Sequence, residues 1–300
     1  MTATAIGTDA ATAVIVRTPR RYKAQALLWK VILYAILLTL TAFILLPVGW
    51  MLTAALKPDL APIFTTKLDF WPTQYWDWDN FNRAFTEAFP FLQYMINTTI
   101  IVVGCILGAL LSCSVVGFAF ARLRFRGSNF LFTVLIITML IPWQALMVPQ
   151  FLMFYKIGWY GTYLPLIVPS FGGSAFFIFL IRQYMRTIPR DLDDAARVDG
   201  LSTFQIFRYI ILPLSTPVLT VCAVFTFLGS WNNLLGPLIY LDNQNSFTVS
   251  LGLANMVTIV GTPWNLLMAA NFLSLIPPVL VYFLVQRRLI GGIASVGLKG

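Results

Sequence analysis

Long uncharged apolar stretches alternate along this chain with short segments that hold its charged residues. Asp, Glu, Lys and Arg are absent from 31–56, 88–121, 127–155, 157–181, 209–241 and 243–286. An α-helix needs about 20 mostly apolar residues to cross the hydrocarbon core of a bilayer. The pattern therefore predicts an all-α, polytopic membrane protein with one domain over 29–286, whose six spans lie at about 29–55, 93–121, 129–155, 161–181, 209–235 and 265–286.

The basic residues predict the orientation of these spans. They gather before span one, after span two, after span four and after span six, whereas the opposite side carries only Lys57, Lys67, Arg83 and Lys156. Because Lys and Arg favour cytoplasmic loops, we expect a cytoplasmic N-terminal tail (1–28), loop (182–208) and C-terminal tail (287–300). The first apolar run is too long for a signal peptide and lacks a small-residue cleavage site, so we expect it to be retained.

Composition narrows the class of protein further. The chain of 300 residues is 59% hydrophobic and only 10% charged, which excludes a soluble enzyme, a disordered chain and a disulfide scaffold. It has no histidine, hence no His-based catalyst or His metal site. Cys105, Cys113 and Cys222 lie in apolar stretches and are expected to be packing residues. We expect no catalytic residue, no metal and no nucleic-acid partner, because the +9 charge follows the topology and the lipid headgroups.

Loop 182–208 has the signals of two short helices joined by a glycine. Pro189 can occupy the first turn of the first helix, with Asp191, Asp193 and Asp194 at its positive end. Gly200 suits the C′ position, and Ser202 with Gln205 forms a capping box for the second helix. Ala195 and Ala196 are expected to leave a flat surface on the first helix that another protein can approach. A solvated loop with ordinary caps is the alternative.

The spacing within this loop resembles the EAA motif of ABC-importer permeases, which is Glu-Ala-Ala, three residues, Gly, nine residues and Ile-x-Leu-Pro. The matching residues here are Asp194, Ala195, Ala196, Asp199, Gly200, Ile210, Leu212 and Pro213. Phe120-Ala121-Arg122-Leu123-Arg124-Phe125, Trp231-Asn232-Asn233 and the closing Gly297-Leu298-Lys299-Gly300 resemble the carbohydrate, maltose-type branch. The resemblance covers about 25–300 and points to the smaller, six-helix permease. Asp194 departs from the family Glu by one methylene and keeps the charge.

The resemblance implies a transport subunit rather than an enzyme. Such permeases pair with a second homologous permease in the bacterial or archaeal cell (inner) membrane and sit on two cytoplasmic ATPase subunits, which bind ATP and Mg. An extracellular solute-binding protein delivers the solute, here a di- or oligosaccharide. The residues that match the EAA motif are then the ATPase-coupling residues. This chain has no Gly-x-x-x-x-Gly-Lys-[Ser/Thr] loop, so we expect it to bind no cofactor itself.

Uncharged polar and aromatic residues in or near the spans are candidates for the substrate path. They are Asn97, Trp143, Gln144, Gln150, Trp231, Asn232, Asn233 and Asn271. Amides and aromatic faces suit sugars, but the same residues also serve as interfacial belts and interhelical hydrogen bonds. The outer loop 236–264 either extends towards the solute-binding protein or caps the helix ends.

Other functions remain open at this point. A glycerol-phosphate-type or other polyol solute is the alternative within the importer class, although the spans lack a cation to bind an anion. A secondary carrier usually needs ionisable residues inside the membrane, and the spans have none. A membrane enzyme needs a catalytic cluster, and the EAA spacing already accounts for the only group of carboxylates, 191–199.

Overall fold

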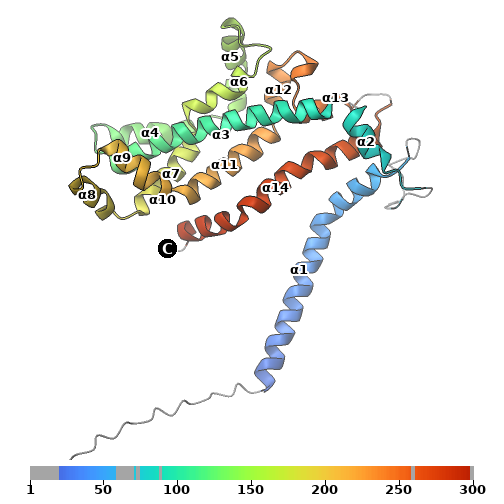
Figure 1. Ribbon diagram of the computed structural model, residues 1–300, viewed down its shortest axis with the longest axis horizontal. Coiled ribbons are helices and arrows are strands. Elements are labelled where there is room, and N and C mark those ends of the chain that lie inside the picture. The colour runs from blue at the N-terminus through green and yellow to red at the C-terminus, as the bar shows by residue number, and fades with distance from the viewer. Residues whose placement is uncertain (1–19, 59–70, 72–74, 88–89, 258–260, 298–300) are drawn as a thin grey trace, which may run out of the picture. The chain divides into compact units, whose positions relative to one another are not determined.

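The computed structural model describes residues 20–58, 71, 75–87, 90–257 and 261–297. The tail before residue 20 and the closing Leu298-Lys299-Gly300 lie outside these ranges. Every regular element among the described residues is helical (Figure 1). The elements are α1 (Arg20–Ala55), α2 (Asp79–Thr86), α3 (Phe91–Arg122), α4 (Ser128–Thr138), α5 (Trp143–Lys156), α6 (Leu164–Ile167), η1 (Val168–Gly172), α7 (Ala175–Thr187), α8 (Asp191–Val198), α9 (Thr203–Ile206), η2 (Phe207–Ile211), α10 (Leu212–Leu214), α11 (Thr216–Trp231), α12 (Leu235–Tyr240), η3 (Gln244–Ser246), α13 (Val249–Asn255) and α14 (Trp264–Gly297).

The chain divides into two compact units, 1–50 and 51–300. In the first unit, the described part of α1 is a lone helix whose large apolar side chains from Leu27 to Val48 are exposed. Its two threonine hydroxyls bond within the helix, since Thr39 and Thr41 donate to the carbonyls of Ala35 and Leu37. Exposed apolar side chains and an internally bonded backbone are what a helix in lipid requires.

Several helices are long and apolar enough to cross a membrane. Within the described ranges, four qualify by length and composition, or up to six if each of two bent helix pairs forms one span. The first pair, α4 and α5, bends by 94° just before Trp143, where Pro142 is in an extended conformation. The second pair, α9–α10 and α11, bends by 74° at Ser215, between Pro213 and Pro217. Both bends lie at prolines, which cannot donate a helical hydrogen bond.

The second unit is built on α3, which runs through it with α7 and α11 packed alongside (Figure 1). Glycines on α3 let its neighbours approach closely. A Cβ added at Gly104, Gly108 or Gly117 would lie 2.7 Å from a side-chain atom of a residue in α6, η1 or α7. Small residues at such spacing are a common device for packing helices in membranes, where tight contact replaces the hydrophobic effect.

Buried clusters lie near both ends of α3. At its C-terminal end, Ile181, Met185, Ile206 and Ile211 form a core with Ala196 of α8. This core joins the region of α8 and α9 to α3, α7 and α11. We call residues 182–208 the elbow, in keeping with its two short helices.

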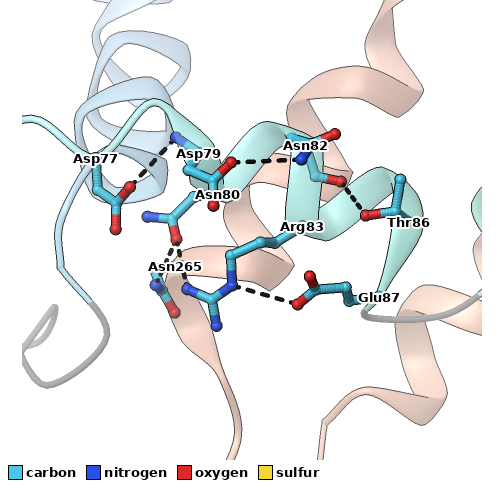
Figure 2. A network of polar contacts seen from close by, with 8 residues as sticks. All are labelled: Asp77, Asp79, Asn80, Asn82, Arg83, Thr86, Glu87 and Asn265. Atoms are coloured by element: carbon cyan, nitrogen blue, oxygen red, sulfur yellow. Dashed lines mark hydrogen bonds and ion pairs between the residues drawn. The ribbon is translucent and has the colours of Figure 1, made fainter.

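Near the N-terminal end of α3, a polar network joins three parts of the second unit (Figure 2). The side-chain amide of Asn80 in α2 donates to the carbonyls of Ala55 and Lys57, at 3.0 and 2.9 Å. Its Oδ1 accepts from Asn265 at the start of α14, at 3.2 Å, and from Arg83. Asn80 is fully buried, so this network fixes how the end of α1, α2 and α14 meet.

Candidate functional site

The elbow has the caps that its sequence predicts. Gly200 follows α8 with φ +83°, and its N–H donates to the Arg197 carbonyl. The N–H of Leu201 donates to the Ala196 carbonyl, which completes a Schellman motif. Ser202 and Gln205 form the predicted capping box, with each side chain bonded to the other residue's backbone N–H. The turn between α8 and α9 is therefore fixed by local hydrogen bonds.

The start of α8 differs from the prediction. Pro189 lies before the helix, because α8 begins at Asp191 with Arg190 as its N-cap. Ile188 is extended, the conformation that a following proline favours. Its carbonyl accepts a 2.9 Å hydrogen bond from Nη2 of Arg122, the last residue of α3. α7 also continues past the expected boundary at 181, as far as Thr187.

A buried ion pair attaches α8 to α3. Arg122 Nε lies 3.5 Å from Asp193 Oδ2, and the two side chains are only 2% and 6% exposed. By contrast, Asp194, the first residue of the EAA match, is exposed and pairs with Arg197 at 2.8 Å within α8. Adjacent aspartates therefore have different roles, since Asp193 anchors the helix and Asp194 faces outwards.

The expected flat surface of Ala195 and Ala196 is wrong for Ala196. Its side chain is 4% exposed and lies in the core beneath α8, because residues 193 and 196 share the inner face of the helix. The outer face carries Leu192, Ala195 and Val198, and Val198 is 89% exposed. We call these three residues the outer face of α8.

The remaining residues of the EAA match lead from the elbow into α11. Residues 207–211 form a turn of π-helix, in which the N–H of Leu212 donates to the Phe207 carbonyl. The wider turn precedes Pro213, which has no N–H to continue the regular helical pattern. Ile210 and Leu212 pack against the buried core at this end of α3, whereas Asp199 is exposed.

Three of the substrate-path candidates meet in one cavity. Trp231, Asn232 and Asn271 line a space of about 330 Å³ at the end of α11, between α13 and α14. Ser250 of α13 and Ser274 of α14 also line it. Trp231 is only 5% exposed and its Nε1 donates to the Ser274 carbonyl at 3.3 Å, so its ring is held between helices.

The other candidates lie elsewhere. Asn97 is 2% exposed and clamps the outer loop, since its Nδ2 donates to the carbonyls of Asn245 and Phe247 while its Oδ1 accepts from Gln93. Asn233 Oδ1 accepts from the N–H of Gly236 in the first turn of α12. The three candidates on α5, which are not among the residues lining the cavity, are Trp143, Gln144 and Gln150.

Neither the ion pair between α3 and α8 nor the serines of the cavity were predicted from the sequence. Arg122 served as a marker of topology and Asp193 as a helix-start signal, and the two were not paired. Ser250 and Ser274 were not candidates, although each is a polar residue within a long uncharged stretch, which is a usable signal. The missing information was long-range. Arg122 and Asp193 come from α3 and α8, and Ser250 and Ser274 come from α13 and α14.

Residues 113–294 match the family described as "Binding-protein-dependent transport system inner membrane component", and the chain belongs to this family. It is 36% identical over 222 residues to the arabinooligosaccharides transport system permease protein of Halalkalibacterium halodurans, with 74% of this chain and 79% of that protein covered. It is 31% identical to the lactose transport system permease protein of Rhizobium radiobacter, with 85% and 92% covered.

A solved structure agrees in fold. A chain from the crystal structure of a bacterial ABC transporter involved in the import of the acidic polysaccharide alginate matches with a TM-score of 0.75. The match covers 87% of this chain and 96% of that one at 20% identity. The predicted all-α permease fold and the predicted family are therefore confirmed.

Proposed function

We propose that this chain is a permease subunit of an ATP-driven importer that takes up a di- or oligosaccharide. The observation that carries the proposal is the family membership together with relatives named for sugars. The maltose/maltodextrin transport system permease protein of Yersinia pestis, 31% identical with 71% of this chain covered, adds a third such relative.

The proposed assembly has this chain in the cell membrane with both termini cytoplasmic and the six predicted spans crossing the bilayer. A second permease completes the pathway, two ATPase subunits bind ATP and Mg on the cytoplasmic side, and a solute-binding protein delivers the sugar outside. The outer loop 236–264 extends on that outer side. Asn97 bonds to the carbonyls of Asn245 and Phe247 in its described part, which supports a fixed position for this part of the loop.

The elbow is the proposed point of coupling to the ATPases. Its outer face on α8 (Leu192, Ala195 and Val198) is the docking surface, and its inner face is attached to α3 through Asp193 and to the core through Ala196. A movement of the ATPases at the outer face is therefore transmitted to α3, α7 and α11. Only a rigid element with different contacts in two states can bias such an equilibrium.

Changing Val198 to serine tests the docking surface. A well-packed apolar contact at an interface centre is worth more than about 1 kcal/mol, and we expect uptake to fall about tenfold. Abundance should stay normal, because the side chain is 89% exposed in this chain. The control is Val198→Leu, which keeps an apolar side chain and should retain uptake in reconstituted vesicles. Equal uptake by both variants would contradict the assignment of this face.

The function itself is tested by purifying the tagged chain from native membranes in mild detergent and identifying its partners by mass spectrometry. We expect an ATPase, a second permease and a solute-binding protein. The purified assembly should take up sugar into vesicles only when ATP is present. Recovery of this chain alone in several detergents, with sugar uptake independent of ATP, would favour the secondary-carrier alternative instead.

A further inference from the structure

We infer that the cavity at the end of α11 is a subsite for a neutral sugar unit of the transported carbohydrate, an inference that rests on the proposed function. The cavity brings together polar residues from separate elements, namely Asn232 after α11, Ser250 in α13, and Asn271 and Ser274 in α14. Its volume of about 330 Å³ lies at the lower end of the range of ~300–1,000 Å³ for small-molecule sites. It suits a small ligand or one end of a longer chain.

The hydrogen bonds of the lining leave mainly acceptors unused. The hydroxyls of Ser250 and Ser274 donate to the carbonyls of Trp231 and Asn271, at 2.9 and 2.7 Å. Their oxygens therefore face a ligand only as acceptors. The Trp231 indole N–H is likewise occupied by the Ser274 carbonyl.

The two amides add to this bias. Asn232 and Asn271 each donate from Nδ2 to a carbonyl of their own helix, those of Leu228 and Leu267, at 3.0 and 2.8 Å. As far as the described residues go, each amide keeps one N–H and its Oδ1 for a ligand. The lining thus offers a ligand four acceptor oxygens, two from amides and two from hydroxyls, and two N–H donors. This set suits a molecule rich in O–H groups.

The charge of the lining residues distinguishes between neutral sugars and anionic solutes as ligands of the cavity. None of the described residues that line this cavity is charged. Another cavity in the same unit, of about 440 Å³ at the elbow, has charged walls, with four arginines and the two aspartates Asp193 and Asp194. An anion without a cation or a set of free donors loses its hydration without replacement. The cavity at the end of α11 therefore favours a neutral sugar over a glycerol phosphate or a uronate.

The test places a reporter thiol in the cavity of the intact purified importer. In Ser250→Cys, or in Ser274→Cys as a second reporter, the rate of labelling by a small thiol reagent is measured in detergent. The probes are a mixture of maltose, lactose, arabinobiose and diacetylchitobiose, and an anionic mixture of glucuronate, galacturonate and glycerol 3-phosphate. Wild-type protein gives the background, since Cys105, Cys113 and Cys222 are buried. We expect the neutral mixture to slow labelling about tenfold at ~10 times its dissociation constant and the anionic mixture to have no effect.

Matched controls separate a subsite from a general change in shape. Ser230→Cys places a thiol of similar exposure in a different cavity, of about 390 Å³. Its labelling should not respond to sugar. Adding Asn271→Leu to Ser250→Cys should weaken protection about tenfold, whereas Gln286→Leu, further along α14 and not among the lining residues, should leave protection intact.

Uptake into vesicles by the same preparation distinguishes the two levels of failure. Normal ATP-dependent uptake from the neutral mixture without protection at either reporter would overturn the subsite alone. Protection by the anionic mixture, or equal protection at Ser230→Cys, would also overturn it. Loss of all ATP-dependent uptake, with every subunit present, would contradict the proposed function and the subsite with it.

Discussion

Replacing Arg122 by methionine is expected to lower the free energy of unfolding by about 3–5 kcal/mol, the usual cost of leaving one member of a buried ion pair alone. The change strands Asp193, whose side chain is 6% exposed, and also removes the donor to the Ile188 carbonyl. The link between α3 and α8 is lost with them. We expect low abundance in the membrane and early thermal unfolding in mild detergent, measured by fluorescence-detected size exclusion.

The double variant Arg122→Met, Asp193→Leu is the control for this prediction. Replacing a whole buried ion pair by apolar residues of similar volume is often neutral or stabilising. The double variant should therefore recover most of the abundance that Arg122→Met loses. Normal thermal stability in the single variant would show that the pair does not hold α8 in place.

Replacing Gly200 by valine is expected to abolish uptake while insertion and abundance stay normal. Gly200 has φ +83°, a left-handed conformation that a β-branched residue adopts only at a cost of ~1–3 kcal/mol. Apart from its two chain neighbours, no described residue has a heavy atom within 4 Å of an added Cβ, so the backbone conformation opposes the substitution. Relief of the strain breaks the bonds to the carbonyls of Arg197 and Ala196, and changes the angle between α8 and α9.

Asparagine at the same position is the matched control, because it tolerates the left-handed region far better than valine. Gly200→Asn should keep most of the ATP-dependent uptake in reconstituted vesicles. Uptake at the normal rate by Gly200→Val would remove the basis for treating the elbow as the coupling element. Ala196→Glu is a poorer test, since that side chain is buried and a charge there also disturbs folding.

Local features of the elbow were predictable because the atoms involved are close in sequence. The capping box needs only Ser202 and Gln205, and the Schellman turn needs only the residues around Gly200. Apolar stretches likewise predict membrane helices from their own composition. Whether α5 and α4 form one span is a different matter, because Pro142 marks a break in the helix without stating its angle.

The candidate site was less predictable because it depends on which segments meet. An isolated Asn is equally suited to a solute and to a backbone carbonyl. Asn97 is occupied by the outer loop, whereas Asn271 retains an amide oxygen at a cavity. The inner position of Ala196 follows from the packing of α8 on α3, which the spacing of the EAA match does not encode.

The glycines of α3 have a mechanical consequence. A helix packed so closely that a single added carbon would collide with its neighbour cannot slide or roll without losing that contact. We expect α3 and α7 to move together as one rigid body during any conformational change. Flexing is then confined to the breaks at prolines, where the helices bend by 94° between α4 and α5 and by 74° before α11. The same sequence thus separates the parts that must stay together from the parts at which the molecule can flex.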